Sequence, residues 1–233
     1  SRGVCIPPPR LLLGLSSFEQ HESPGCDHVV YSLQKFARLA LAGNPNIIET
    51  LFTDRSDVLF IDAVGERLVA ARERMLSRRV GERFMVYALA QRKRIEGHHR
   101  WLETPPEREP KPTEFGGSEE AGKVRWATSE GRKEYKAAHK KWTQYVSWRA
   151  GRNPKRAALE DAYGYDTKHA QHLCRLLTMG EEILRDGEVR VRRPDAEFLR
   201  SVRGGALSYD ELTAWIDERV ERLPALAASS PLP

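Results

Sequence analysis

The sequence of 233 residues predicts an α+β fold that is predominantly helical. Apolar residues recur at helical spacing in most segments between residues 32 and 185. Runs typical of strands are short, such as residues 29–31, which follow a Pro-Gly turn. Because 40% of the residues are hydrophobic, the chain can bury a core, and we expect a folded globular protein.

The N-terminal region is expected to combine strands with two helices. Residues 1–6 are typical of the tail of a strand. Residues 32–42 have helical periodicity, and Gly43 stands where a helix C-terminal cap belongs. Asn44 and Pro45 then suit the N-cap and the first position of a second helix.

The second helix leads into the helical middle of the chain. Its apolar residues are expected to point inward, which places Glu49 on the exposed side. A short strand is predicted over residues 57–61, followed by helices over residues 63–77 and 80–102, where charged and apolar residues alternate with a period near that of a helix. Residues 103–122 are rich in Pro, Gly, Glu and Thr, so we expect a linker or long surface loop there.

The C-terminal part is predicted to be mainly helical. Its expected elements are a basic helix over residues 130–149, a shorter helix after Asn153-Pro154, a helix over residues 166–185, a possible strand over residues 188–191, and a last helix opened by Ser208 with Glu211 in a capping-box pattern. The predicted organisation is therefore an α/β unit (1–62), a helical region (63–102), a linker (103–122), a basic helical region (123–224) and a frayed tail (225–233).

Positive charge is concentrated in one part of the chain. The formal net charge is +5, but residues 123–175 hold thirteen Lys or Arg against five Asp or Glu. Clustered cations gain affinity for polyanions by releasing counterions from phosphates. The pattern fits a nucleic-acid partner, although a solvated helical face would also produce it.

Several classes of protein are excluded or disfavoured. The sequence has no apolar run long enough for a membrane span and no secretory signal pattern, so we expect a cytoplasmic protein without a membrane partner. Cys5, Cys26 and Cys174 are an odd number without paired short spacing, which favours reduced, mostly buried thiols over disulfides or a zinc site. A metal-dependent hydrolase is disfavoured because the histidines form no recognisable metal cluster.

The segment at residues 164–175 is the most informative for chemistry. Lys168, His172 and Arg175 follow one another at i, i+4 and i+7, so a helix would point three nitrogen-bearing side chains the same way. Such a face could bind a triphosphate or an RNA backbone, and it could also be plain solvated surface. His169 lies on the neighbouring stripe, which is expected to pack inward, and Asp166 can cap the helix.

Aromatic residues are interleaved with the basic helix. Trp142, Tyr145 and Trp148 fall on one side of it, next to Lys141 and Arg149. This arrangement could stack bases beside a phosphate track, whereas packing of the stripe into a core is the simpler interpretation.

Five short stretches, distributed over most of the chain, form a pattern through their residues, order and spacing. They are Arg2-Gly3-Val4; Tyr31-Ser32-Leu33-Gln34-Lys35-Phe36; Gly43-Asn44-Pro45-Asn46 with Glu49-Thr50-Leu51-Phe52; His99-Arg100-Trp101-Leu102; and Gly164-Tyr165-Asp166-Thr167-Lys168-His169-Ala170. Each is weakly specific alone. Together they resemble the predicted nucleotidyltransferases of the DNA polymerase β superfamily that are associated with RNA repair pathways.

The resemblance implies that residues 1–62 are the remainder of a nucleotidyltransferase α/β unit. In that family a Gly-Ser pair and two aspartates one residue apart precede the Arg-Gly-Val segment, which here is Arg2-Gly3-Val4. We therefore expect the given sequence to be a fragment or a processed chain. The two aspartates would hold two Mg²⁺ (or Mn²⁺) ions, which align the attacking hydroxyl and the nucleotide phosphate.

The resemblance also implies an activity, namely transfer of a nucleotide from a nucleoside triphosphate to a hydroxyl, with RNA, including tRNA, as the expected acceptor. The chain as given is expected to be inactive, because the main metal carboxylates are absent from it. A non-catalytic RNA-binding or partner-binding module of the same superfamily is the alternative.

The resemblance finally suggests site residues. Asp27 is the candidate for a third, catalytic metal carboxylate, with Glu22 as the alternative and a plain turn residue as the simpler interpretation of Asp27. Lys35 could contact phosphate or be a surface lysine, and Glu49 could line the cleft. The remaining candidates for binding phosphates or the acceptor strand are Lys168, His169, His172 and Arg175.

Overall fold

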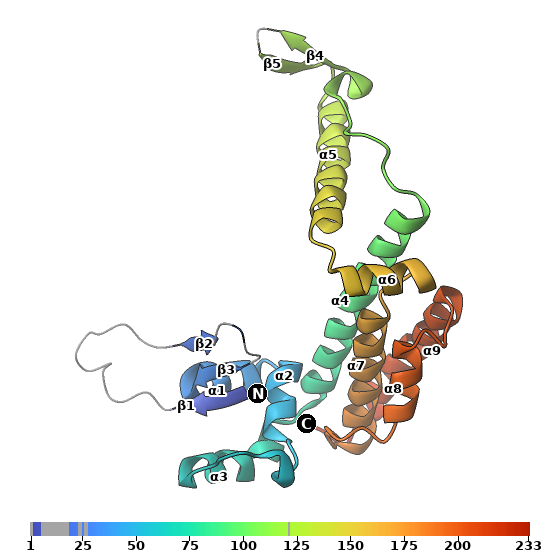
Figure 1. Ribbon diagram of the computed structural model, residues 1–233. Helices are drawn as coiled ribbons and strands as arrows, with labels where there is room; N and C mark the ends of the chain where they lie inside the picture. Colours follow the sequence, from blue (N-terminus) through green and yellow to red (C-terminus); the bar gives the residue numbers. More distant parts are fainter. Residues whose placement is uncertain (1, 6–18, 23–24, 26–27, 121) are drawn as a thin grey trace, which may run out of the picture. The chain divides into compact units, whose positions relative to one another are not determined.

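The computed structural model describes residues 2–5, 19–22, 25, 28–120 and 122–233, and these residues are predominantly helical, as the sequence predicts (Figure 1). They divide into two compact units. The first unit comprises Ser1–Arg92 and Ala170–Pro233, and the second unit comprises Lys93–His169.

The first unit contains a small mixed sheet. Its strands are β1 (Arg2–Cys5), β2 (Gln20–Glu22) and β3 (Val29–Ser32), in the order β1-β3-β2. β1 runs parallel to β3, and β2 runs antiparallel to it. The strands predicted near residues 1–6 and 29–31 are confirmed.

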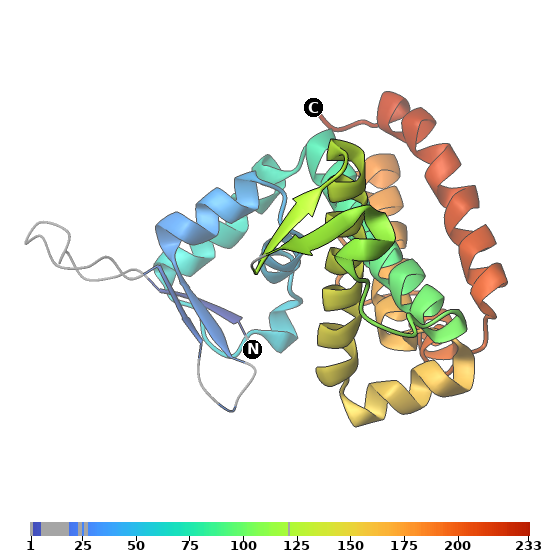
Figure 2. The ribbon, with the colours of Figure 1, turned by 90° about the horizontal axis from the view of Figure 1, so that it is seen from above.

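Two short helices follow the sheet. Helix α1 (Leu33–Leu41) lies against β1 and β3 (Figure 2), and the Ser32 hydroxyl caps it by accepting a hydrogen bond from the Lys35 amide. Gly43 has a positive φ of 69°, and a side chain there would crowd Arg83 and Val80, so glycine suits the turn that ends α1. Helix α2 (Pro45–Leu51) begins as predicted, with Asn44 as its N-cap.

The apolar faces of these helices form a buried cluster of Phe36, Ala40, Ile47 and Leu51. Residues packed against this cluster include Tyr31 from β3 and Leu68 from α3 (Ala63–Ala70). Burial of large apolar side chains of this kind stabilises a fold by about 1.5–3 kcal/mol each. The cluster therefore holds the sheet, α1 and α2 together as one structural element.

The strand predicted over residues 57–61 is wrong. A short 3-10 helix, η2 (Arg55–Asp57), forms instead, because the Asp54 carboxylate accepts hydrogen bonds from the amide and hydroxyl of Ser56. Leu59 and Phe60 are 93% and 84% exposed, so the apolar pattern at these positions does not reflect burial. The single helix predicted over residues 63–77 is divided into α3 and the 3-10 helix η3 (Arg72–Met75).

Two long helices form the core of the first unit. Within it, α4 (Arg78–Glu103) and α7 (Thr167–Asp186) approach closely (Figure 1). A β-carbon at Gly81 would lie 2.6 Å from Leu184 Cγ, and one at Gly180 would collide with the Met85 sulfur. Leu173 and Leu176 of α7 are fully buried, which confirms the inward stripe predicted for that helix.

The strand predicted over residues 188–191 is also wrong. The segment after α7 is held by side chains rather than by a strand ladder, because Arg193 donates two hydrogen bonds to the Glu182 carboxylate, at 2.6 and 2.9 Å. Arg193 also binds Asp195 and is only 6% exposed. Helix α8 (Ala196–Arg203), which the sequence analysis did not single out, follows this segment.

The last helix, α9 (Tyr209–Ser229), opens with the predicted capping box between Ser208 and Glu211. The helix extends to Ser229 despite the internal Pro224, into the region where the sequence predicts a frayed tail. The C-terminal residues beyond it are also bound. Arg78 donates hydrogen bonds to the carbonyl oxygens of Leu232 and Pro233, so the tail is fixed to the start of α4.

The second unit contains a β-hairpin and two helices in addition to the end of α4. In chain order these elements are η4 (Pro112–Phe115), β4 (Gly117–Glu120), β5 (Lys123–Trp126), α5 (Ser129–Ala150) and α6 (Pro154–Tyr163). β4 and β5 pair antiparallel. The region expected to be a linker at residues 103–122 thus contributes one strand of this hairpin.

Aromatic residues pack α5 against α4 inside the second unit. Tyr145 is 7% exposed, and its ring lies 6.0 Å from that of Trp101 and 5.9 Å from that of Trp148. Trp101 and Trp148 are themselves 5.2 Å apart. The aromatic stripe of α5 is therefore a packing surface, which is the simpler of the two interpretations that the sequence allows.

Two further expectations concern thiols and membranes. Cys174 is a fully buried free cysteine on α7, and burial raises the pKa of its thiol to about 12. Within the described part of the chain, no helix is both long enough and apolar enough to cross a bilayer.

The close approach of α4 and α7 predicts the effect of adding a single methyl group. Gly81→Ala should lower the free energy of unfolding by about 1–2 kcal/mol, because the overlap with Leu184 outweighs the helix-propensity gain of about 1 kcal/mol. Gly97→Ala is the matched control on the same helix, since nothing lies within 4 Å of its added carbon. It should stabilise by about 0.5–1 kcal/mol. Equal effects of both substitutions in urea denaturation would contradict the close approach.

Candidate functional site

The carboxylates predicted to bind metal do not form a described site. Asp27 lies outside the described residues, and its alternative Glu22 is exposed at the end of β2, where it binds the Gln20 side chain. Among the residues that the structure describes, no group of three or more His, Cys, Asp or Glu is arranged to hold a metal ion. The described donors therefore do not fit a two-metal centre by themselves.

Lys35 lies on α1, directly after the sheet. Its amine is 3.8 Å from one carboxylate oxygen of Glu19, and the Arg38 guanidinium is 3.6 Å from the other. The Lys35 side chain is 22% exposed. The amine of this half-buried lysine is paired with an exposed carboxylate, and such a weak ion pair can be exchanged for a phosphate at little cost.

Glu49 of α2, Arg175 of α7 and His172 of α7 form a cluster in the first unit. Arg175 Nη1 donates to Glu49 Oε2 at 2.5 Å, and Arg175 Nη2 lies 3.4 Å from His172 Nδ1. Glu49 is 6% exposed, so the prediction that it lies on the exposed side of its helix is wrong. The physical reason is the pairing with Arg175, which removes the cost of burying an isolated carboxylate.

One feature of this cluster is left unsatisfied within the described part of the chain. Glu49 Oε1 is buried and has no hydrogen-bond partner there. Leaving a buried acceptor unpaired costs about 1–3 kcal/mol, so such atoms are uncommon in stable proteins. The Glu49 carboxylate therefore has acceptor capacity beyond its bond to Arg175.

Lys168 and His169 belong to the second unit, at the start of α7. The Asp166 carboxylate caps this helix by accepting hydrogen bonds from the amides of Lys168 and His169, at 2.8 and 3.1 Å. The predicted capping role of Asp166 is confirmed. The Lys168 side chain is exposed, and His169 Nε2 lies 3.6 Å from Asp166 Oδ2 and 3.5 Å from Arg156 Nη1.

The pKa of His169 is lowered from its ordinary value of 6.5. Burial is the main cause, Asp166 opposes it, and the nearby guanidinium groups of Arg156 and Arg94 act in the same direction as burial. The neutral imidazole is therefore favoured in the folded protein. This histidine is suited to accepting or donating one hydrogen bond rather than to acting as a fixed cation.

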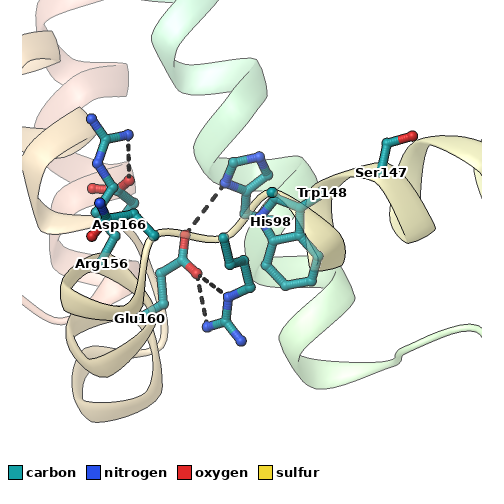
Figure 3. A pocket seen from close by; sticks show the side chains of 9 residues that line it. His98, Ser147, Trp148, Arg156, Glu160 and Asp166 are labelled. Carbon is teal, nitrogen blue, oxygen red and sulfur yellow. Dashed lines mark hydrogen bonds and ion pairs between the residues drawn. The ribbon is translucent and has the colours of Figure 1, made fainter.

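A pocket of about 230 Å³ lies in the second unit (Figure 3). It is lined by His98 of α4, Ser147, Trp148, Gly151, Arg152 and Asn153 around the end of α5, Arg156 and Glu160 of α6, and Asp166. No single motif in the sequence predicts this set of residues. The available signal was the pair Arg152 and Arg156, spaced by four residues within the basic segment.

Each buried carboxylate of the pocket faces an arginine, as Figure 3 shows. Glu160 is 3% exposed and accepts from Arg152 at 2.9 Å, and Asp166 is 2% exposed and lies 3.6 Å from Arg156. His98 Nδ1 is 3.6 Å from Glu160 but makes no hydrogen bond within the described part. Because the carboxylates are neutralised, the pocket suits a polar organic group better than a divalent cation.

The amino-acid sequence was finally compared with known proteins. Residues 1–203 match the model of RlaP, the RNA repair pathway DNA polymerase beta family. The chain belongs to this family. No curated protein and no solved structure matches the chain.

Membership in the RNA repair pathway DNA polymerase beta family confirms the resemblance found from the five sequence stretches. The protein is of the polymerase β-like nucleotidyltransferase type. The match includes all of β1, α2 and α7, and with them the Glu49–Arg175–His172 cluster. It also includes the whole of the second unit with its pocket.

The lowered pKa of His169 predicts a pH dependence of stability. Between the folded-state pKa and about 6.5, the unfolded chain binds more protons at this position than the folded protein. The free energy of unfolding should therefore fall as the pH is lowered through about 6.5, and this loss should level off below the folded-state pKa. Denaturation at a series of pH values should show a shallower slope in His169→Gln than in the wild type. An unchanged slope would exclude His169 as the cause.

Proposed function

We propose that the protein transfers a nucleotide from a nucleoside triphosphate to a hydroxyl group on RNA. The family match supports the transfer chemistry, since nucleotidyltransferases of the polymerase β type share this reaction class. The excess of cations in residues 123–175 supports a nucleic acid as the acceptor. The RNA repair association of the family favours RNA over DNA.

Arg175 is the residue that we propose to bind the phosphates of the nucleotide. Glu49 holds one terminal nitrogen of its guanidinium, and the side chain remains 26% exposed. A guanidinium has five donors in a rigid plane, so a carboxylate bound to Nη1 leaves donors for phosphate oxygens. A preoriented arginine also loses little conformational freedom when a phosphate binds.

The other predicted residues complete this proposal. Lys168 and His169 precede His172 and Arg175 on α7, which is continuous from Thr167 to Asp186. We assign Lys168 to phosphate binding and His169 to a hydrogen bond with the nucleotide or the acceptor strand. Lys35 is proposed as a further phosphate contact in the first unit.

We further propose that the transfer reaction uses a divalent metal ion. Mg²⁺ or Mn²⁺ would supply charge neutralisation at the reacting phosphate and activate the attacking hydroxyl. Asp27 is the candidate ligand within this sequence, and the described residues do not complete a metal site. The roles proposed for this chain are therefore binding and orientation of the triphosphate by Arg175 and Lys168.

Nucleotide binding tests these roles directly. Lys168→Ala should weaken binding of a non-hydrolysable ribonucleoside triphosphate roughly tenfold to hundredfold in calorimetry, because one charge-assisted contact is lost. Its melting temperature should stay close to that of the wild type, because the side chain is exposed. Arg175→Ala should also lose affinity, but it should destabilise the fold by about 3 kcal/mol because it leaves Glu49 buried without a partner.

A double variant separates binding from stability at this position. Glu49→Gln combined with Arg175→Gln removes both charges, so it should recover most of the stability lost in Arg175→Ala. If Arg175 binds phosphate, the double variant should still bind the analogue at least tenfold more weakly than the wild type. Wild-type affinity in a well-folded double variant would show that the ion pair only joins α2 to α7.

Transfer activity gives a further test. The sequence contains no two aspartates separated by a single residue, so the 233 residues alone should incorporate almost no labelled nucleotide into RNA with Mg²⁺ or Mn²⁺, while they still bind the triphosphate. Robust incorporation would show that carboxylates within this chain suffice for catalysis. Failure to bind any triphosphate at low salt would instead favour a non-catalytic binding module.

A further inference from the structure

The exposed face of α5 carries a regular row of cations, which we call the cationic stripe. It is formed by Arg132, Lys136 and Lys140, which follow one another at intervals of four residues, with Lys133 beside them. All four residues are exposed. Residues at this spacing share one side of a helix, so their charges act on the same partner.

The packing of α5 fixes the direction in which the cationic stripe faces. Tyr145, which lies on the opposite side of the helix from Lys136, is buried against Trp101 and Trp148. Nearer the start of the helix, Tyr135 packs against Phe115 and Trp126, at 5.9 and 5.2 Å. The aromatic contacts at both ends hold α5 in one rotational position within the second unit, with the cationic stripe outward.

The charge of the cationic stripe is not used inside the protein. Within the described part of the chain, neither Arg132 nor any of the three lysines takes part in an ion pair. Of the two acidic residues of α5, Glu134 lies on a different side of the helix from Arg132, Lys136 and Lys140. Glu130 lies one turn before Lys133 and accepts a hydrogen bond from Ser129. By contrast, Arg152 just beyond this helix is bound to carboxylates.

The spacing of the stripe suits a nucleic-acid backbone. Four residues of an α-helix rise about 6 Å, so the three aligned cations extend over about 12 Å. Phosphates recur about every 3.4 Å along the axis for each strand of a duplex, so several phosphates fall within this length. The same face continues through the exposed residues Thr143 and Ser147. The Ser147 hydroxyl can also donate to phosphate oxygens, whereas the Thr143 hydroxyl donates to the His139 carbonyl oxygen at 3.0 Å.

The composition of the face distinguishes between two kinds of nucleic acid. Proteins that bind single strands combine cations with exposed aromatic side chains on which bases stack. None of the four residues of the cationic stripe is aromatic, and Tyr145 packs on the opposite side of α5. The rings of Tyr135 and His139, which border the stripe, pack against each other, and His139 also binds Glu109. A surface that offers only cations and hydroxyls contacts backbone and not bases, which is the mode in which duplex RNA is bound by shape.

We propose that the cationic stripe docks the phosphate backbone of duplex RNA. The inference rests on the proposed function for the identity of the nucleic acid as RNA. It assigns to the second unit the task of holding the acceptor stem. Nucleotide binding stays with Arg175 and Lys168, outside the stripe.

Binding of a fluorescent RNA duplex, followed by anisotropy over a range of salt concentrations, tests this proposal. The triple variant Arg132→Gln, Lys136→Gln, Lys140→Gln should bind the duplex at least tenfold more weakly at about 0.1 M salt. The slope of log affinity against log salt should become shallower by about 2–3, since about 0.9 is lost with each phosphate contact. An unchanged slope would overturn the assignment of the stripe.

A matched control variant loses three positive charges at exposed positions outside α5. Arg74, Arg79 and Arg200 are exposed and take no part in an ion pair within the described part of the chain. Their triple change to Gln should alter duplex affinity less than about threefold, and thermal melts should show that both triple variants fold. Equal losses in the two variants would mean that net charge, and not the stripe, governs binding.

Two further binding measurements distinguish duplex RNA from single-stranded RNA as the ligand, and distinguish this proposal from the proposed function. The wild type should bind the RNA duplex more tightly than either of its single strands, and tighter binding of a single strand would overturn the duplex assignment. The stripe variant should bind the triphosphate analogue as the wild type does. If the analogue does not bind at all but duplex binding depends on the stripe, the proposed transfer function fails and the docking surface stands.

Discussion

Helices α4 and α7 can lie as close as they do in the first unit only because glycine occupies position 81 on one and position 180 on the other. The close approach brings Leu184 against the backbone of α4 and fixes the C-terminal half of α7 within the first unit. Two charged contacts then depend on the position of α7. Arg175 reaches Glu49 of α2, and Glu182 receives Arg193 from the segment that follows. The candidate nucleotide-binding cluster is thus held by the same packing that forms the core.

Pairs of arginine and carboxylate are a repeated solution in this protein. Glu49, Glu160 and Glu182 are all buried, and each is bound by an arginine. Such ion pairs contribute little net stability compared with apolar packing. Removing one partner is nevertheless costly, because the other charge is then buried away from water without a counter-charge. They therefore act mainly to specify which segments meet. In the case of Glu49, one carboxylate oxygen also has no hydrogen-bond partner among the residues that the structure describes.

Local signals in the sequence were sufficient for most helices. The caps at Asn44, Asp166 and Ser208 act within three residues of their own position, so they can be identified without knowledge of the fold. Interactions between distant segments could not be predicted in this way. Glu49 and Arg175 are 126 residues apart, and nothing near Glu49 indicates that its helix buries a charge. The apolar pairs at residues 59–60 and the segment 188–191 resembled strands, but no neighbouring strand is available to them in the described structure.

In the candidate site, too, local sequence patterns could be predicted, whereas contacts between distant segments could not. Helical spacing predicted that Lys168, His172 and Arg175 share one face of α7, and the family match over residues 1–203 includes this helix. Their role in binding phosphate stays a prediction. Resemblance did not reveal the pocket of the second unit, because its residues come from α4, α5 and α6 and have no common spacing in the sequence. The only local signal was the four-residue spacing of Arg152 and Arg156, within a general excess of positive charge.

Because Cys174 is buried, the reactivity of its thiol can report local opening of the core around α7. Its thiol is inaccessible and, with a pKa of about 12, almost entirely protonated at neutral pH, so an alkylating reagent can modify it only while the surrounding core is open. In a background without Cys5 and Cys26, the rate of labelling would measure how often the helix that carries Arg175 separates from its neighbours. A bound triphosphate that contacts this helix would slow the labelling rate. Triphosphate binding would then be coupled to the frequency of local opening of the core.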